Sequence, residues 1–436
     1  MNKFQQMYQE KLRTPQEIAK EIKSGDICAS TSALGEPEAI IEALTDRAYA
    51  GEIENVSHHF LLACRKWRYF EPELANKIKH VAWFSSANAR TPIKEGRADF
   101  LPNFYYEVPR YWREFIEPDV SYAMVSPMDE HGYFSFGVGA SEGHAQMSRA
   151  KKRFLEVNPH MPRVLGDTAV HISEVTAICE SNKPLPSPPD PELTPNDIKI
   201  GELVAERIPN GATVQFGIGA MPNAVGKKLM NKKHLGIHSE MFTNSMLELI
   251  EAGAVDNSMK NINRGKSVAA FSLGSRAMYD YLHDNPGVYF APVSYTNDPR
   301  IISQNDNVVS INACIEVDFL GQVCSESVGP RNISGTGGQL DFVRGANWSK
   351  GGRSYICMYS TADIKGEIVS KITPMLAQGA HVTTHKGDVD CIVTEYGVAE
   401  LKGKSAAQRA LALIAIAHPQ FRDELFFQAK QLNLMV

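Results

Sequence analysis

The chain contains an internal repeat, and this repeat constrains its fold more than any other feature. The segments 22–44 (IKSGDICASTSALGEPEAIIEAL) and 208–229 (IPNGATVQFGIGAMPNAVGKKL) follow one order: a helix end, a glycine, a short apolar strand, a loop of small residues, a proline and an amphipathic helix. A glycine, a proline and a D-x-x-G turn recur at separations of 185 to 189 residues (25 to 211, 37 to 222, 132 to 321). Unrelated strand–loop–helix units also resemble one another, but three anchors at one spacing favour an internal duplication.

A proline-rich segment separates the two copies. Six of the 24 prolines lie between residues 184 and 195 (PLPSPPDPELTP). Because proline fixes φ and donates no backbone hydrogen bond, we predict a stiff extended linker here. The predicted organisation is therefore an N-terminal domain over residues 1–183, a linker over 184–195 and a C-terminal domain over 196–436. Asn196 or Asp197 is expected to cap the first helix after the linker.

Both halves alternate short β-rich runs with helical patterns. Continuous Val, Ile and Phe runs between helical segments are typical of parallel sheets that helices cover on both faces. We therefore predict an α/β fold of two similar α/β domains with largely parallel sheets, and an active site between them at the carboxyl ends of strands. The predicted strands are Val81–Phe84, Ala123–Val125, Thr213–Phe216, Val308–Asn312, Tyr355–Tyr359 and Cys391–Thr394, and the predicted helices include Pro222–Met230 and Ser405–Ala417.

Composition excludes several classes of protein. Of 436 residues, 43% are hydrophobic and 22% charged, which is ordinary globular usage and excludes a disordered chain. A net charge of -5 argues against a nucleic-acid partner. There is no apolar run of about 18 residues and no apolar core of a secretory signal, so we expect a cytoplasmic protein without a membrane partner. The seven cysteines are odd in number and form no C-x-x-C pair, so we predict neither disulfides nor a metal site.

The loop Gly217–Pro222 (GIGAMP) is the first candidate binding site. It follows the predicted strand Thr213–Phe216 and opens a helix whose first position suits Pro222. Two glycines let the backbone approach a ligand, and the N–H groups of a helix start favour negative charge. Three alternatives fit this pattern: an oxyanion or acyl-thioester cradle, a tight turn without ligand, and a dinucleotide site. The last is weakened because proline replaces the third glycine of G-x-G-x-x-G.

Two other segments carry candidate chemistry. Three glycines among residues 335–338 (GTGG) indicate either a backbone open to a ligand or a flexible surface loop. Glu240 (in HSEMFTN) follows the apolar run Leu235–Ile237 and precedes Met-Phe, which indicates a short strand ending at a cleft. The alternative is an ordinary solvated glutamate. The first copy has Phe60 and Leu61 at the matching place, so only one copy would carry the carboxylate.

These segments together resemble class I CoA-transferases of the acetyl-CoA hydrolase/transferase family. The motifs that carry the resemblance span nearly the whole chain in order: GIGAMPNAV, HSEMFTN, EVDFLGQVCSE, GTGGQLDFVRGA and DVDCIVTEYGVAEL. The resemblance implies transfer of CoA between a short-chain acyl-CoA (4-hydroxybutyryl-CoA or butyryl-CoA) and a carboxylate such as acetate. It implies a ping-pong mechanism through a glutamyl-CoA thioester on Glu240. CoA is then a substrate, no cofactor is tightly bound, and the protein is a homodimer or a dimer of dimers.

The same resemblance assigns roles to other residues. It implies catalytic-site positions for Asn297 and Glu395, the latter lining the acyl pocket. The segment that meets the thioester oxygen and CoA comprises Gly217, Ile218, Gly219, Ala220 and Met221. The pantetheine would lie along Gly337 and Gly338, and Lys365 is a weaker candidate for CoA contact. Because Glu240 must be ionised to attack, its pKa is not expected to be strongly raised.

Several alternatives stay open. An acyl-CoA hydrolase would use the same glutamate, a dinucleotide-binding oxidoreductase would use GIGAMP, and a sensor of acyl-CoA would leave Glu240 dispensable. Residues 30–32 (Ser-Thr-Ser) either contact the incoming acid or cap the helix near Glu36. Four lysines either meet the CoA phosphates or form a solvated helix face: Lys227, Lys228, Lys232 and Lys233.

Overall fold

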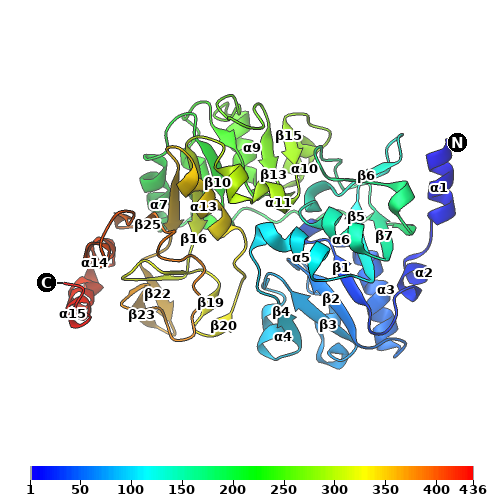
Figure 1. Ribbon diagram of the computed structural model, residues 1–436, viewed down its shortest axis with the longest axis horizontal. Helices are drawn as coiled ribbons and strands as arrows, with labels where there is room; N and C mark the ends of the chain where they lie inside the picture. The colour runs from blue at the N-terminus through cyan, green and yellow to red at the C-terminus, as the bar shows by residue number, and fades with distance from the viewer. Residues whose placement is uncertain (1, 436) are drawn as a thin grey trace. The chain divides into compact units, whose positions relative to one another are not determined.

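The structure is a computed structural model that describes residues 2–435, and it divides into two compact units (Figure 1). Unit 1 contains the chain up to Pro189 together with Val268–Thr296. Unit 2 contains Asp190–Ser267 together with the chain from Asn297 onward. Residues 181–194, which include most of the predicted linker, form neither helix nor strand.

The segment Val268–Thr296 belongs to unit 1 because backbone hydrogen bonds tie it there. The N–H of Phe290 donates to the carbonyl of Leu165 and the N–H of Asp167 donates to the carbonyl of Phe290, both at 2.9 Å. Gly166 lies so close to Phe290 that an added Cβ would overlap its carbonyl oxygen. The elements of this segment are β14 (Phe271–Ser272), α10 (Arg276–Leu282), β15 (Val288–Phe290) and α11 (Val293–Thr296).

Unit 1 is built on a seven-stranded sheet in the order β4-β3-β2-β1-β5-β7-β9, in which all neighbours are parallel. Every residue of β5 is buried, as expected for a central strand of a parallel sheet. The strands are β1 (Ile27–Ser30), β2 (Val56–Phe60), β3 (Ile78–Ala82), β4 (Ala98–Phe100), β5 (Val120–Val125), β7 (Lys152–Val157) and β9 (Ala177–Glu180). The helices are α1 (Lys3–Lys11), α2 (Pro15–Lys20), α3 (Glu38–Tyr49), α4 (Arg90–Lys94), α5 (Val108–Glu114) and α6 (Gly143–Arg149).

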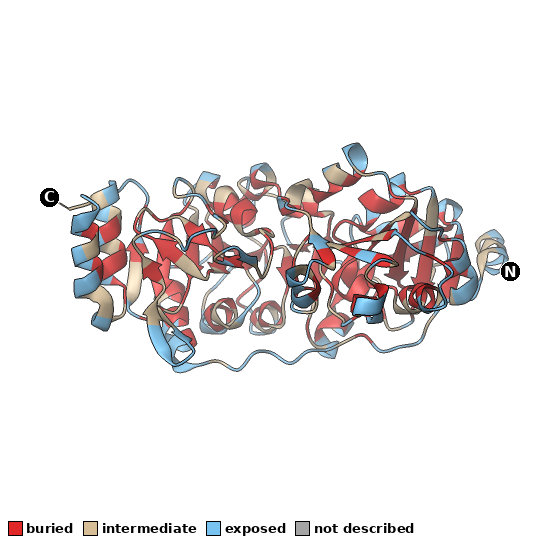
Figure 2. Cartoon of the chain, turned by 90° about the horizontal axis from the view of Figure 1, so that it is seen from below, coloured by how far each residue is buried: buried red, intermediate tan, exposed pale blue. Residues whose placement is uncertain are grey.

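Unit 2 is built on a six-stranded sheet in the order β11-β10-β16-β21-β25-β26, parallel except for its last pair. Its strands are β10 (Thr213–Phe216), β11 (Gly236–Ile237), β16 (Val308–Ala313), β21 (Arg353–Cys357), β25 (Cys391–Thr394) and β26 (Gly397–Glu400). Its longer helices are α7 (Pro195–Ala205), α8 (Ala220–Lys228), α9 (Asn244–Glu251), α13 (Gln339–Trp348), α14 (Ala406–Ala415) and α15 (Arg422–Gln431). Strands β5, β10 and β25 are buried along their whole length, whereas α15 buries only Leu425 and Ala429 (Figure 2).

The two sheets repeat one another, which supports the predicted duplication. The order β2-β1-β5-β7-β9 in unit 1 corresponds to β11-β10-β16-β21-β25 in unit 2. The D-x-x-G turns match atom by atom: Asp129 Oδ1 accepts from the N–H groups two and four residues later at 2.9 Å each, and Asp318 Oδ1 does the same at 3.0 and 2.8 Å. Their glycines, Gly132 and Gly321, have φ of 88° and 86°. The predicted class of two similar α/β domains is confirmed.

Several predicted boundaries differ from the structure. Strands Thr213–Phe216 and Cys391–Thr394 are as predicted, but the helix expected to begin at Pro222 begins at Ala220. Gly219, at φ 128°, ends the extended loop, and proline is tolerated in the first helical turn because N–H groups there lack intrahelical partners. Helix α7 is capped by Thr194, not Asn196 or Asp197. Thr194 and Asp197 form a reciprocal capping box.

Three further observations concern the chain as a whole. All seven cysteines are free thiols, and six of them are buried. Across residues 2–435, none of the helices has both the length and the hydropathy required to cross a membrane. In the same part of the chain, no group of three or more His, Cys, Asp or Glu side chains is arranged to hold a metal ion.

Candidate active site

Glu240 lies between two short strands of unit 2. It follows β11 and directly precedes β12 (Met241–Phe242). Its neighbours Ser239 and Met241 are buried, whereas the Glu240 residue is partly exposed. The apolar run that predicted a strand before Glu240 therefore forms one, and Glu240 is a partly exposed residue between buried neighbours.

Two donors hold the Glu240 carboxylate. The Asn297 amide nitrogen Nδ2 donates to Glu240 Oε2 at 2.8 Å, and the backbone N–H of Gly338 also donates to the carboxylate. A Cβ added at Gly338 would overlap both Glu240 Oε2 and Asn297 Nδ2, although its φ of -94° suits any residue. Glycine is required at 338 by this close approach. The structure thus brings together Glu240, Asn297 and Gly338, which the sequence predicted for one site.

Burial raises the pKa of Glu240 to about 7, and the hydrogen bonds from Asn297 and Gly338 partly offset that increase. The sequence analysis expected no strong increase. The difference arises because the folded chain removes the carboxylate from water, which disfavours its charged form. Near neutral pH the group is therefore divided between its neutral and charged forms.

Asp341 is a further carboxylate at this site. Its Oδ2 lies 3.4 Å from Asn297 Nδ2, the same nitrogen that donates to Glu240. It is 1% exposed and lies in the first turn of α13, where the helix dipole favours negative charge. The motif GTGGQLDF contains Asp341, but the sequence analysis assigned this residue no role.

The glycine loop before α13 is braced, which excludes the alternative of a flexible surface loop. Glu326 is 6% exposed; its two carboxylate oxygens accept from the hydroxyls of Thr336 and Thr383, each at 3.1 Å. Its carbonyl oxygen accepts from the N–H groups of Ile333 and Ser334. The segment that ends at Gly338 is therefore anchored at its start by a buried carboxylate.

The GIGAM segment lies at the carboxyl end of β10 and forms the start of α8. Ile218 is 54% exposed, and Gly219 has φ 128° with no atom within 4 Å of an added Cβ. Beneath the loop, Gln215 and Asn312 exchange two side-chain hydrogen bonds of 3.1 and 3.2 Å. Gly217 packs against the Asn312 amide, so the loop has a fixed base and an open face. Ala220 and Met221 are the first two helical residues.

Glu395 and Lys365 lie on other elements of unit 2. Glu395 directly follows β25, and it accepts from the Ser360 N–H at 2.9 Å and from the Ser360 hydroxyl at 2.6 Å. Lys365 is exposed at the turn of the hairpin β22 (Thr361–Ile364) and β23 (Glu367–Ser370). Within residues 2–435, the structure gives neither side chain a hydrogen bond or an ion pair with Glu240.

The structure bears on two alternatives that the sequence left open, one for residues 30–32 and one for the four lysines. The side chain of Ser32 makes no capping bond to the helical turn that follows it, and α3 begins only at Glu38, so the structure does not support the alternative in which Ser32 caps a helix near Glu36. In unit 2, Lys227, Lys228 and Lys233 are exposed, and Lys228 forms an ion pair with Glu202 at 2.7 Å. This arrangement favours a solvated face.

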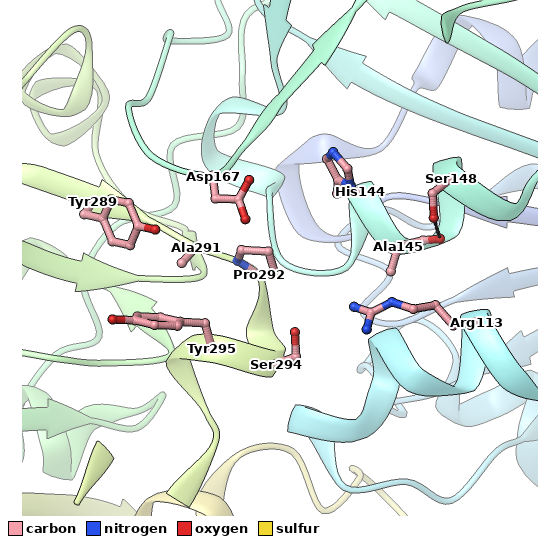
Figure 3. Close-up of a pocket in the computed structure, with 10 residues that line it drawn as sticks. All are labelled: Arg113, His144, Ala145, Ser148, Asp167, Tyr289, Ala291, Pro292, Ser294 and Tyr295. Carbon is pink, nitrogen blue, oxygen red and sulfur yellow. Dashed lines mark hydrogen bonds between the residues drawn. The ribbon is translucent and has the colours of Figure 1, made fainter. Parts of the chain in front are cut away.

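Unit 1 contains a separate cavity of about 230 Å³ (Figure 3). Arg113 and His144 face it from α5 and α6, and Asp167 and Tyr289 approach from the opposite wall. The remaining lining residues are Ala145, Ser148, Ala291, Pro292, Ser294 and Tyr295. None of the predicted site residues lines this cavity.

Comparison with known proteins identifies the family. The N-terminal domain of the acetyl-CoA hydrolase/transferase family matches residues 1–187, and its C-terminal domain matches residues 274–429. The chain is 45% identical to a succinyl-CoA:cyclohexane-1-carboxylate CoA transferase of Geobacter metallireducens, over 99% of this chain and 97% of that protein. It is 44% identical to a 4-hydroxybutyrate coenzyme A transferase of Clostridium kluyveri, over 98% and 99%. The crystal structure of RipA from Yersinia pestis superposes with a TM-score of 0.94 at 41% identity and covers 100% of both chains. The chain belongs to the acetyl-CoA hydrolase/transferase family.

Proposed function

We propose that the chain transfers CoA between a short-chain acyl-CoA, such as 4-hydroxybutyryl-CoA or butyryl-CoA, and a carboxylate such as acetate. The observation that carries this proposal is the carboxylate of Glu240, a partly exposed residue, held by hydrogen bonds from Asn297 and Gly338. Relatives that are 44–45% identical over almost their whole length are CoA transferases, which supports the reaction class. Their acids differ greatly in size, so the preferred acid of this chain is left to experiment.

In the proposed reaction Glu240 is the nucleophile. A carboxylate oxygen attacks the thioester carbon, the C–S bond breaks, and CoA leaves as a thiolate with a mixed anhydride on Glu240. The thiolate then attacks the Glu240 carbonyl carbon, the first acid leaves as its carboxylate, and a glutamyl-CoA thioester remains. A second carboxylate reverses both steps. Covalent catalysis divides a difficult exchange into easier steps, and proximity contributes about 7–11 kcal/mol.

The donors to Glu240 serve both halves of this reaction. Before attack, Asn297 and Gly338 orient the carboxylate. When thiolate attacks the glutamyl carbonyl, negative charge develops on a Glu240 oxygen, and the same donors stabilise it as an oxyanion hole does. We assign the oxygen of the incoming thioester to the helix start at Gly217, Ile218, Gly219, Ala220 and Met221, the pantetheine to Gly337 and Gly338, the acyl pocket to Glu395 and a CoA contact to Lys365. CoA is long, so its remote binding energy is available at the reacting carbon.

The alternative is an acyl-CoA hydrolase, in which water replaces the second acid and attacks the Glu240 thioester or anhydride. The family name covers both activities. The partly exposed position of Glu240 allows a small acid and water alike to approach.

The test is an intact-mass spectrum after brief incubation with butyryl-CoA and no acceptor, followed by peptide mapping. We expect a CoA adduct on the peptide that contains Glu240, discharged by acetate with formation of acetyl-CoA. Steady release of free CoA without dependence on acetate would establish the hydrolase instead. Absence of both adduct and release would overturn the enzymatic proposal.

Gel filtration tests the accompanying proposal of a homodimer or dimer of dimers, which a monomeric mass would exclude.

A further inference from the structure

We infer that Asp341 is a positioning residue, which holds the Asn297 amide in the orientation that donates to Glu240. The inference rests on the proposed role of Glu240 as nucleophile. It concerns a residue that neither the resemblance nor the proposed mechanism uses, and it explains how the nucleophile keeps its donor.

The first argument is the geometry of one nitrogen. Asn297 Nδ2 lies 2.8 Å from Glu240 Oε2 and 3.4 Å from Asp341 Oδ2. An asparagine side chain presents two donor hydrogens on nitrogen and an acceptor on oxygen. If the amide rotated by half a turn, its oxygen would face two carboxylates. Asp341 therefore penalises the orientation in which Glu240 loses its donor.

The second argument is the place of these groups in the fold. Gly338 is the residue that caps α13, and Asp341 is the third residue of the same helix. The Gly338 N–H, one donor to Glu240, thus lies at the start of α13. The Asn297 amide, the other donor, is held in place by Asp341 of the same helix. Asn297 and Asp341 are both buried, so little water is available to replace either contact. The first turn of α13 therefore controls both hydrogen bonds of the nucleophile.

Asp341 has two conceivable effects on Glu240, and they differ in sign. Acting through Asn297, Asp341 strengthens a donor to the charged form, so its removal raises the pKa of Glu240. Acting directly as a neighbouring negative charge, Asp341 opposes ionisation, so its removal lowers the pKa of Glu240. The positioning role requires the first result.

The experiment measures the rate of glutamyl-CoA formation from butyryl-CoA against pH, by rapid quench and mass spectrometry. For Asp341→Ala we expect the midpoint of the pH profile to move up by about one unit and the plateau rate to fall about tenfold. The KM for butyryl-CoA should stay within about threefold of that of the natural chain. Asp341→Asn, which keeps one acceptor oxygen, should lie between Asp341→Ala and the natural chain.

A double-mutant cycle gives an independent readout. Asn297→Ala should show the largest shift, and the double variant Asn297→Ala/Asp341→Ala should be no slower than Asn297→Ala alone, because the positioning effect of Asp341 on Glu240 passes through that amide. Asp390→Asn is the matched control. It removes a buried carboxylate of the same unit, whose contacts are Arg353 and Ser354, and should leave the midpoint unchanged.

The outcomes separate this inference from the proposed function. If the natural chain forms no adduct at Glu240, the proposed function fails. If the natural chain forms it, three results overturn the positioning role: an unchanged or lowered midpoint in Asp341→Ala, equal effects of Asp341→Ala and Asp341→Asn, or full additivity in the double variant. If Asp341→Ala does not fold, the direction of the shift in the isosteric Asp341→Asn and its cycle with Asn297→Ala decide the question.

Discussion

Gly338 and Glu240, almost one hundred positions apart in the sequence, approach so closely that no side chain fits between them. The backbone N–H of Gly338 donates to the carboxylate, and an added Cβ would overlap its oxygen. Because the backbone conformation of Gly338 is accessible to any residue, the contact alone selects glycine. A substitution that adds a side chain at 338 would therefore displace Glu240 without straining the backbone of residue 338.

Gly338→Ala should therefore fold but lose adduct formation by at least about 10²-fold, since Glu240 is displaced and its donor misaligned. The measurement is the single-turnover rate with butyryl-CoA, with thermal unfolding as the check on folding. Gly253→Ala is the control. It adds a methyl group in open space at φ 68°, so it introduces backbone strain without touching the site. Equal single-turnover rates in the two variants would contradict the close approach.

The pH profile of adduct formation should rise through about pH 7 in the natural chain, because burial raises the pKa of Glu240 to about 7 and the charged form attacks. Rates should be low at pH 5.5 and approach a plateau above pH 8. A profile already flat at pH 5.5 would show that Glu240 ionises as an ordinary surface glutamate does.

Glu240→Gln should abolish exchange and also change how stability depends on pH. The pKa of Glu240 is raised above its ordinary value of 4.5, so the folded chain holds a proton that the unfolded chain releases between these values. The stability contributed by the neutral carboxyl is present at low pH and is lost as pH rises to about 7. Relative to the natural chain, Glu240→Gln should gain about 1–3 kcal/mol between pH 4.5 and pH 8. Urea unfolding at the two pH values measures the gain, and parallel stability curves would refute it.

Glu326→Gln should loosen the glycine loop. An amide offers one acceptor oxygen in place of two and carries no charge, so the hydroxyl of either Thr336 or Thr383 loses its acceptor and the remaining bond is no longer charge-assisted. We expect a loss of about 1–3 kcal/mol in unfolding free energy and a higher KM for acyl-CoA. Thr383→Val, which removes the brace on the side away from the loop, is the matched comparison and should affect KM less. A KM unchanged in both variants would show that the loop does not contact the substrate.

The paired D-x-x-G turns predict similar costs for the loss of their Oδ1 contacts in the two copies. The second oxygens differ, because Asp129 Oδ2 accepts from Arg163 at 3.4 Å and Asp318 Oδ2 accepts from the Gln322 amide at 2.6 Å. Asp129→Ala and Asp318→Ala each remove an acceptor of two backbone N–H groups, and each should lower stability by about 1–3 kcal/mol. Thermal unfolding of the two variants measures this. A large cost in only one copy would show that the repeated turn does not have the same structural role in both.

Local patterns in the sequence predicted local structure well. The strand Thr213–Phe216 is bounded by turn residues, and the turns at Gly132 and Gly321 require positive φ, so both features are readable from short segments. The predicted start positions of helices were less accurate, because the start of a capped helix depends on which side chain accepts a hydrogen bond from a backbone N–H of the first turn. Thr194 does so before α7 and Ser32 does not before the turn that follows it.

Long-range placement was not readable from local patterns. The meeting of Glu240, Asn297 and Gly338 was expected only through the family resemblance, since the contacts join three separate parts of the chain. The raised pKa of Glu240 arises from burial in the folded chain, which no sequence pattern displays. The assignment of Val268–Thr296 to unit 1 depends on pairing with residues near Gly166, more than one hundred positions earlier.

The position of Val268–Thr296 in the sequence, between two parts of unit 2, also constrains how the protein folds during synthesis. Ribosomes release the chain from its N-terminus, so unit 1 lacks one of its parts until Thr296 has emerged. By then Asp190–Ser267 of unit 2 has already been synthesised. All seven strands of the unit 1 sheet precede the linker, but the backbone of residues 165–167, which pairs with Phe290, stays without this partner while Asp190–Ser267 is synthesised. Nascent chains that end between Pro189 and Thr296 should therefore be the forms that chaperones retain.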